Sequence, residues 1–137
     1  MNPQIVYREG YEYQLVEDYQ IQIFIKPDAF IRTQLIRLDT DGVLYILAGY
    51  AWDGPSGPAV DTKNFMVGSL VHDALYQLMR EGYLDPVLFR EVADGELVRL
   101  CKEDGMSALR RSWVYAGVRF GGGPAASEPV PLLTAPE

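Results

Sequence analysis

The only histidine of the chain, His72, lies in a run whose polar residues recur at helical spacing. On a helix, Ser69, His72, Asp73 and Tyr76 share one broad face. A histidine buried beside a carboxylate and a phenol must have its hydrogen bonds satisfied by them. The run therefore indicates either a structural hydrogen-bonded cluster or an imidazole arranged for proton transfer.

A second polar pair, Arg90 and Asp94, is one helical turn apart further along the chain. The connection between the two helices is short, which favours antiparallel packing. Asp94 would then orient the imidazole of His72 and fix its tautomer, as in histidine–carboxylate pairs that act as general bases. The alternative is an exposed ion pair between Arg90 and Asp94, which adds little stability.

A loop rich in glycine and proline, residues 50–58, precedes these helices. Gly54 and Gly57 permit backbone conformations that aim carbonyls or amides inward. Asp53 and Ser56 add side-chain oxygens. The alternative is a connector in which these two residues cap local amides.

With Asp94 assigned to the imidazole, Asp73 is left for a different role. A carboxylate beside a loop rich in carbonyls suits a hard cation such as calcium. Together, the loop and the two polar helices favour an active site, working or former, over a purely structural cluster. Tyr50 and Trp52 in the same loop leave a sugar-ring ligand open as a further alternative.

The elements that must position these residues follow from periodicity. The first half predicts an antiparallel sheet of about four strands, because apolar residues alternate or cluster in short runs. Asp41–Gly42 predicts a hairpin turn between the last two runs. Residues 49–63 contain too many glycines and prolines for a regular element. The four runs are 11–16, 20–25, 30–38 and 43–48.

Three helices are predicted after the loop. Asp85 is expected to cap the second helix and Pro86 to begin it. Gly95 inside that helix indicates that another backbone approaches there, since glycine otherwise weakens a helix. The predicted spans are about Asn64 to Glu81, Asp85 to Gly105, and Ser107 to the glycines at 121–123.

The predicted fold class is α+β, with residues 1–123 forming a single domain. Pro124–Glu137 is a proline-rich extended tail that carries Val130, Leu132 and Leu133. These apolar side chains leave two interpretations of the tail. It either docks on a neighbouring subunit or is disordered.

The composition excludes several function classes. The formal net charge of -7 argues against nucleic-acid binding, which needs a basic face. The basic group Arg110, Arg111 and Arg119 is expected to be a solvated helix face or a packing contact. A single histidine and a single cysteine, Cys101, do not make a zinc site. Thiol catalysis by Cys101 is not expected among apolar neighbours, and no apolar run is long enough to span a bilayer.

The residues of interest form an ordered series of motifs. This series resembles the family called domain of unknown function 1353, found in tailed phages and prophages. The resemblance implies synthesis in the host cytoplasm, assembly into a virion and contact with other phage structural proteins, but no settled activity. The motifs are Asp53 with Ser56 and Pro58; His72, Asp73, Leu75 and Tyr76; Ala93 and Asp94; and Tyr115, Val118, Arg119 and Gly122.

A glycine-bearing loop, a His-Asp-x-x-Tyr helix and an aspartate on the next helix are also similar to a second group. These are the calcium-dependent secretory (type-two) phospholipases A and the related domain of parvovirus capsids. The resemblance implies that His72 activates the attacking water and that Asp94 and Tyr76 orient His72.

The same resemblance implies a calcium cofactor that polarises the ester carbonyl. Asp73 and loop carbonyls near Trp52 and Gly54 would hold it. This sequence lacks the cysteines of the secretory enzymes, and Pro55 and Pro58 have no amide hydrogen to offer in the loop.

Two functions are therefore expected. The first is a virion-associated protein, at the tail or neck or in assembly, that carries a phospholipase-like site. The second is an active, metal-dependent hydrolase of lipid esters or of the cell envelope. They are compatible, because a virion protein can carry an enzyme for crossing the host envelope.

Overall fold

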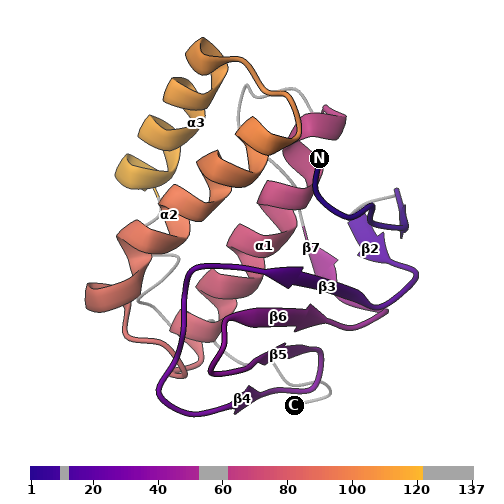
Figure 1. The fold of residues 1–137 in the computed structure, drawn as a ribbon, viewed down its shortest axis with the longest axis vertical. Helices are drawn as coiled ribbons and strands as arrows, with labels where there is room; N and C mark the ends of the chain where they lie inside the picture. Colours follow the sequence, from indigo (N-terminus) through magenta and orange to yellow (C-terminus); the bar gives the residue numbers. More distant parts are fainter. Residues whose placement is uncertain (10–12, 53–61, 122–137) are drawn as a thin grey trace, which may run out of the picture.

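The computed structural model describes residues 1–9, 13–52 and 62–121. Within them the chain is α+β, as predicted, with two antiparallel sheets followed by three helices (Figure 1). The predicted tail and residues 53–61 of the predicted loop lie outside this description. The elements are β1 (Tyr7–Arg8), β2 (Tyr13–Leu15), β3 (Tyr19–Gln22), β4 (Ile31–Arg32), β5 (Ile36–Leu38), β6 (Val43–Ile46), β7 (Ala51–Trp52), α1 (Lys63–Arg80), α2 (Pro86–Glu103) and α3 (Ala108–Gly121).

The larger sheet has the strand order β3-β6-β5-β4. Its alternating residues, among them Ile21, Leu44 and Ile36, turn their side chains into the core. The predicted hairpin is confirmed: β5 and β6 pair, with Leu38 opposite Leu44. Gly42 in the connecting turn has a φ of 87°, which other residues rarely adopt.

The structure corrects the strand prediction: the described strands form two sheets and not one, and β1 lies before the first predicted run. Two further differences concern single segments. Run 30–38 is two strands, β4 and β5, separated by a turn in which Ile36 N donates to Thr33 Oγ1 at 3.0 Å. Ala51–Trp52, which the sequence placed in an irregular loop, forms β7 and pairs with β2 in the second sheet, ordered β1-β2-β7. Backbone pairing with β2 makes this strand, and local composition does not reveal it.

The helix prediction is confirmed to within a few residues at each end. Asp85 caps α2, because its Oδ1 accepts a hydrogen bond from Val87 N at 2.9 Å, and Pro86 is the first helical residue. Gly82, with a φ of 84°, follows α1 as the expected stop. None of the described helices is long and apolar enough to cross a membrane.

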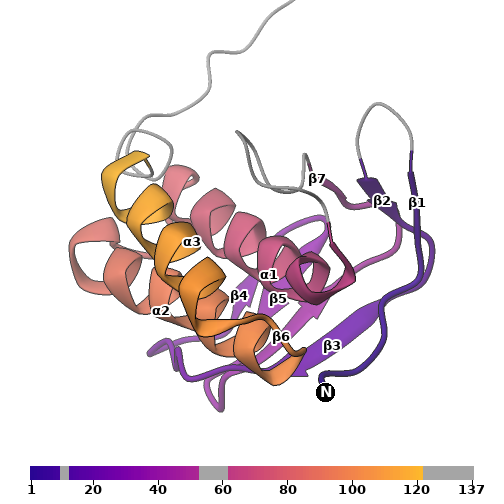
Figure 2. The ribbon, with the colours of Figure 1, turned by 90° about the horizontal axis from the view of Figure 1, so that it is seen from above.

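The helices gather on one side of the larger sheet (Figure 2). α1 is buried along most of its length, with Leu70, Leu75 and Leu78 in the core shared with the sheet. α2 packs against α1, and α3 packs against α2. A second apolar cluster, which includes Phe65, Leu97 and Val114, joins the three helices.

The close approach of α1 and α2 occurs at Gly68, not at the predicted Gly95. A Cβ atom on Gly68 would lie 2.8 Å from Cys101 Sγ and 3.0 Å from Leu97 O. A Cβ atom on Gly95 would meet nothing within 4 Å. The sequence drew attention to Gly95 because it interrupts a helix, whereas only the packing shows which glycine faces a neighbouring backbone.

Candidate active site

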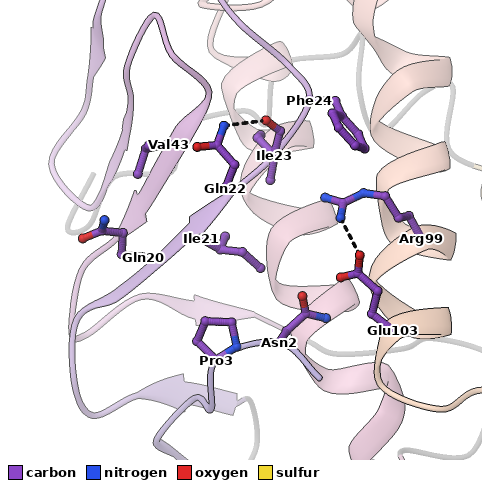
Figure 3. A pocket seen from close by; sticks show the side chains of 10 residues that line it. All are labelled: Asn2, Pro3, Gln20, Ile21, Gln22, Ile23, Phe24, Val43, Arg99 and Glu103. Atoms are coloured by element: carbon purple, nitrogen blue, oxygen red, sulfur yellow. Dashed lines mark hydrogen bonds and ion pairs between the residues drawn. The ribbon is translucent and has the colours of Figure 1, made fainter.

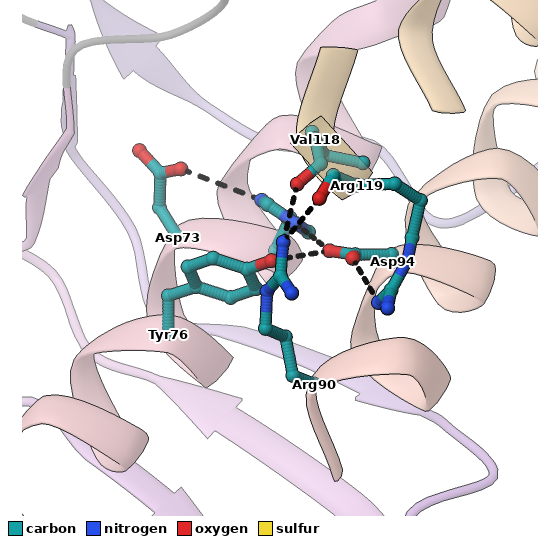
Figure 4. Close-up of polar contacts among 7 residues, drawn as sticks. Asp73, Tyr76, Arg90, Asp94, Val118 and Arg119 are labelled. Carbon is teal, nitrogen blue, oxygen red and sulfur yellow. Dashed lines mark hydrogen bonds and ion pairs between the residues drawn. The ribbon is translucent and has the colours of Figure 1, made fainter. Parts of the chain in front are cut away.

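The centre of the candidate site is a histidine–carboxylate pair between α1 and α2. His72 Nε2 lies 2.7 Å from Asp94 Oδ1, a contact drawn as a dashed line to Asp94 in Figure 4. Both side chains are buried, with Asp94 0% exposed. The antiparallel packing expected from the short connection brings these groups together. Each helix contributes one member, so the pair depends on the docking of α1 on α2.

Asp94 accepts hydrogen bonds at both carboxylate oxygens. Tyr76 Oη donates to Oδ1 at 2.5 Å, and Arg119 Nη1 donates to Oδ2 at 2.8 Å. Burial raises the pKa of Asp94, but hydrogen bonds from His72, Tyr76 and Arg119 outweigh it and lower the pKa below its ordinary value. Asp94, on α2, is therefore a carboxylate anion at neutral pH, held by groups from α1 and α3.

The two ring nitrogens of His72 face different groups. Because Nε2 points at an ionised carboxylate, the neutral ring carries its proton there and its lone pair at Nδ1. Nδ1 lies 3.9 Å from Asp73 Oδ1, the contact drawn to Asp73 in Figure 4. The Asp73 side chain is 36% exposed. In the neutral ring Nδ1 therefore carries the lone pair, whereas in the charged ring Nδ1 is protonated beside Asp73.

The surroundings of His72 also set its basicity. Burial lowers the pKa of His72, but hydrogen bonds and negative charge from Asp73 and Asp94 outweigh it and raise the pKa above its ordinary value. The ring of Tyr76 packs against the imidazole, with 4.2 Å between ring centroids. Burial, together with Asp94, raises the pKa of Tyr76, so its hydroxyl stays protonated and donates to the carboxylate.

Arg90 does not form the ion pair with Asp94 that the sequence offered as an alternative. Its Nη2 donates instead to Val118 O at 3.1 Å and to Arg119 O at 2.6 Å (Figure 4). A cation at the carboxyl end of α3 complements the helix dipole and unsatisfied carbonyls. Arg90 therefore fixes the end of α3, from which Arg119 reaches Asp94.

The sequence-based site residues omit Arg119. It was grouped with Arg110 and Arg111 as a solvated or packing residue, because spacing along one helix does not reveal a partner on another. The structure shows packing contacts for all three, and for Arg119 the partner is the site carboxylate. The signal that could have found Arg119 is its place in the closing motif with Tyr115 and Val118.

Ser69 belongs to a separate cluster, although it lies one turn from His72. Its Oγ accepts a hydrogen bond from Trp52 Nε1 at 3.1 Å and donates to Met66 O at 3.0 Å. The sequence grouped Ser69 with His72, whereas in the structure its hydroxyl bonds Trp52 and holds β7 against α1. The rings of Trp52 and Tyr50 are buried, so neither offers an exposed face to a sugar ring.

The predicted calcium ligands are only partly described. Asp73 and Trp52 are described, whereas the third predicted ligand, Gly54, lies outside the described residues, as do Asp53 and Ser56 of the same loop. Among the residues described, no group of three or more histidine, cysteine or acidic side chains could hold a metal. Calcium takes about six to eight oxygens, so a calcium site here needs carbonyl or water oxygens besides the Asp73 carboxylate.

Cys101 is not a candidate nucleophile. The side chain is fully buried, and burial, together with the charge of Asp104, raises the pKa of its thiol to about 12. A thiol of this kind stays protonated at neutral pH and reacts poorly. This agrees with the expectation that thiol catalysis is absent.

A pocket of about 400 Å³ lies elsewhere, between the edge strand β3 and α2 (Figure 3). On its α2 side, Arg99 is paired with Glu103 and with Glu96, which lies beside the pocket. Glu96 accepts from Phe24 N at 2.6 Å and from Arg99 Nε at 2.8 Å, while the Arg99 guanidinium lies 4.5 Å from the centre of the Phe24 ring. These contacts attach α2 to the segment after β3, which is a structural role.

Comparison of the chain with protein-family models, curated proteins and solved structures finds no match. In the described geometry a buried carboxylate holds one imidazole nitrogen and the other nitrogen faces Asp73, an arrangement that general bases and structural hydrogen-bonded clusters share.

Proposed function

We propose that this protein is a small phage or prophage component that carries a phospholipase-like hydrolase site with His72 as general base. The observation that carries the hydrolase assignment is the 2.7 Å contact between His72 Nε2 and Asp94 Oδ1, with Nδ1 turned toward partly exposed Asp73. A lipid ester is the proposed substrate, because the motif order resembles that of the secretory phospholipases.

In the proposed reaction, His72 Nδ1 removes a proton from water as the water oxygen attacks the ester carbonyl. In the imidazolium that forms, Nε2 keeps its proton and still donates it in a hydrogen bond to Asp94. The negative charge of Asp94 stabilises the imidazolium. Nδ1 then returns the proton to the leaving alkoxide as the carbon–oxygen ester bond breaks. A positioned base of this kind contributes about a hundred- to ten-thousandfold in rate.

Asp94 acts through His72 and is a positioning residue. Tyr76 and Arg119 hold its two oxygens, so the carboxylate keeps its orientation when the imidazole becomes charged. Preorganised groups of this kind avoid reorganisation during the reaction. The interhelical packing thus supplies the fixed geometry that the reaction needs.

The phage setting of the proposal is supported by the ordered motifs from Asp53 to Gly122. We place the protein in the tail or neck of the virion, or in its assembly, after synthesis in the host cytoplasm. Pro124–Glu137 would dock on a neighbouring subunit through its apolar residues. Quantitative mass spectrometry of purified particles tests this setting, and complete absence from virions would contradict it.

A calcium-assisted hydrolase of lipid esters or of the cell envelope is the second candidate. It is favoured by the partly exposed Asp73 carboxylate beside His72 Nδ1. When bound by Asp73 and by the carbonyls of Trp52 and Gly54, calcium would polarise the ester carbonyl. If so, calcium raises the melting temperature of the protein and has no such effect on Asp73→Asn.

The decisive test of the hydrolase is His72→Gln, assayed on a soluble short-chain phospholipid. The glutamine amide can still donate to Asp94, so we expect a loss of about a hundredfold or more in ester cleavage with little change in melting temperature. Gln77→Ala on the same helix is the control and should retain full activity. If His72→Gln keeps all activity and only lowers the melting temperature, His72 is structural.

A further inference from the structure

The helices cover one face of the larger sheet (Figure 2), and a row of polar side chains crosses the other face. Because side chains alternate along a strand, buried Ile36 and Leu38 place Arg37 on this outer face. Tyr45 lies directly opposite Arg37 on β6, and Arg32 lies directly opposite it on β4. The row therefore brings two arginines to adjacent positions on neighbouring strands.

Neither arginine has a partner among the described residues. None of the hydrogen bonds or ion pairs within this part of the chain involves Arg32 or Arg37, and Nε of Arg37 is a buried donor without an acceptor. Like charges directly opposite each other destabilise a sheet, and an unpaired buried donor also costs free energy. No contact fixes the Arg37 guanidinium, so it can turn its donors toward a ligand. An anionic group bound there would offset both costs.

A pocket of about 520 Å³ lies beside Arg37, within the size range of small-molecule sites. Phe30, Tyr45 and Leu47 line it with apolar surface, and the Phe30 side chain is 54% exposed. Gln20, opposite Tyr45 on β3, adds an amide. Arg37 thus meets an apolar, partly aromatic surface and a neutral polar group in one hollow of the sheet.

Two carboxylates, Asp18 and Asp39, also line this pocket, but neither is paired with Arg37. Asp18 Oδ1 accepts a hydrogen bond from Ala48 N at 2.7 Å, and Asp39 Oδ1 accepts one from Val43 N at 2.9 Å. Backbone amides therefore hold each carboxylate through one oxygen. The contacts among the described residues leave the second oxygen of each to accept from a ligand.

This mixture of groups selects the kind of ligand. A guanidinium binds a planar carboxylate through two parallel hydrogen bonds. A multiply charged phosphate is disfavoured, because Asp18 and Asp39 would lie beside it. The same two carboxylates and Gln20 suit hydroxyl groups, and the apolar surface suits ring carbons. We propose that this pocket binds an acidic saccharide, a sugar ring with one carboxylate, and that Arg37 binds the carboxylate.

NMR titration of the full chain tests this site, with the methyl glycoside of glucuronic acid as the probe. The methyl glycoside of glucose is the neutral analogue, since it differs only by a hydroxymethyl group in place of the carboxylate. We expect saturable shifts of the amide signals around Arg37 and Tyr45 with the acidic sugar, and binding about tenfold or more weaker with the neutral sugar. Equal binding of the two sugars overturns the proposal, as does no binding of the acidic one.

The test variant is Arg37→Gln, and the matched control is Arg8→Gln. Arg8 is an exposed arginine on β1, in the second sheet. Arg37→Gln should bind the acidic sugar about tenfold or more weakly, and Arg8→Gln should bind it like the unchanged chain. Because Arg37→Gln also removes a like-charge contact with Arg32, it should not lower the melting temperature. A lower melting temperature with unchanged sugar binding would make Arg37 a structural residue and overturn the proposal.

Two further measurements define the site. Inorganic phosphate should bind more weakly than the acidic sugar, and equal or tighter binding at the same amide signals overturns the saccharide assignment. His72→Gln should bind the acidic sugar like the unchanged chain, because the pocket lies on the face of the sheet away from α1 and α2. Sugar binding without any ester cleavage would therefore reject the hydrolase and support this pocket.

Discussion

Arg119 Nη1 lies 2.8 Å from Asp94 Oδ2, and through this contact the last helix reaches the carboxylate that holds His72. Arg90 binds the carbonyls of Val118 and Arg119 and so fixes the helix end from which the side chain extends. The candidate base is therefore supported by three helices, although the base and its carboxylate come from only two of them.

Removing this cation should weaken the candidate site. Arg119→Gln leaves Asp94 without its charged partner, so we expect about a tenfold loss in kcat on the soluble ester and a smaller loss for Arg119→Lys. Arg111→Gln is the control on the same helix, because Arg111 donates to Met106 O and not to Asp94. Equal kcat values for Arg119→Gln and Arg111→Gln would show that the ion pair has no catalytic role.

Tyr76→Phe removes one hydrogen bond to a buried carboxylate and keeps the ring that packs on His72. We expect unfolding free energy to fall by about 2 kcal/mol, as for hydrogen bonds to charged groups. Chemical denaturation measures this change. Tyr83→Phe, at an exposed tyrosine, is the control and should leave the free energy of unfolding almost unchanged. An unchanged free energy of unfolding for Tyr76→Phe would mean that a water molecule replaces the hydroxyl as the donor to Asp94.

The pH dependence of stability should report the His72–Asp94 pair. The pKa of Asp94 is lowered in the folded protein, so its contribution is present above its ordinary pKa of about 4 and is lost as pH falls through the folded value. The pKa of His72 is raised, so its contribution is present below about 6.5 and is lost as pH rises through the folded value. The His72–Asp94 pair therefore contributes most to the stability of the folded protein between about pH 4 and about pH 6.5.

Melting temperatures from about pH 3 to pH 9 measure this profile. Asp94→Asn should remove the loss of stability at acidic pH that comes from this carboxylate and reduce the loss at alkaline pH, because Asp73 still raises the pKa of His72 in the variant. Asp28→Asn, at an exposed position away from the site, should follow the unchanged chain. The same profile for Asp94→Asn and the unchanged chain would contradict the coupling of the two groups.

The two helical glycines should respond to alanine in opposite ways. Gly68→Ala places a methyl group against Leu97 O and Cys101 Sγ, and should destabilise the protein by about 1 to 3 kcal/mol. Gly95→Ala enters open space and should stabilise by up to about 1 kcal/mol through helix propensity. Denaturation midpoints measure both effects, and a stabilising Gly68→Ala would show that α1 and α2 can separate at little cost.

Much of this protein could be read from the sequence because the relevant interactions are local. The spacing of His72, Asp73 and Tyr76 placed them on one helix face, and Asp85 with Pro86 marked the start of α2. The glycine turn between β5 and β6 followed from the need for a positive φ at Gly42. Each of these features depends on neighbours within a few residues.

Tertiary structure alone decided which polar groups meet. It joined Asp94 to Arg119 instead of Arg90, moved Ser69 to the indole of Trp52, and made β7 from a segment with no strand signal. It also selected Gly68 as the point of helix contact. These outcomes depend on the distance and rotation between packed elements, and no spacing along the chain specifies those.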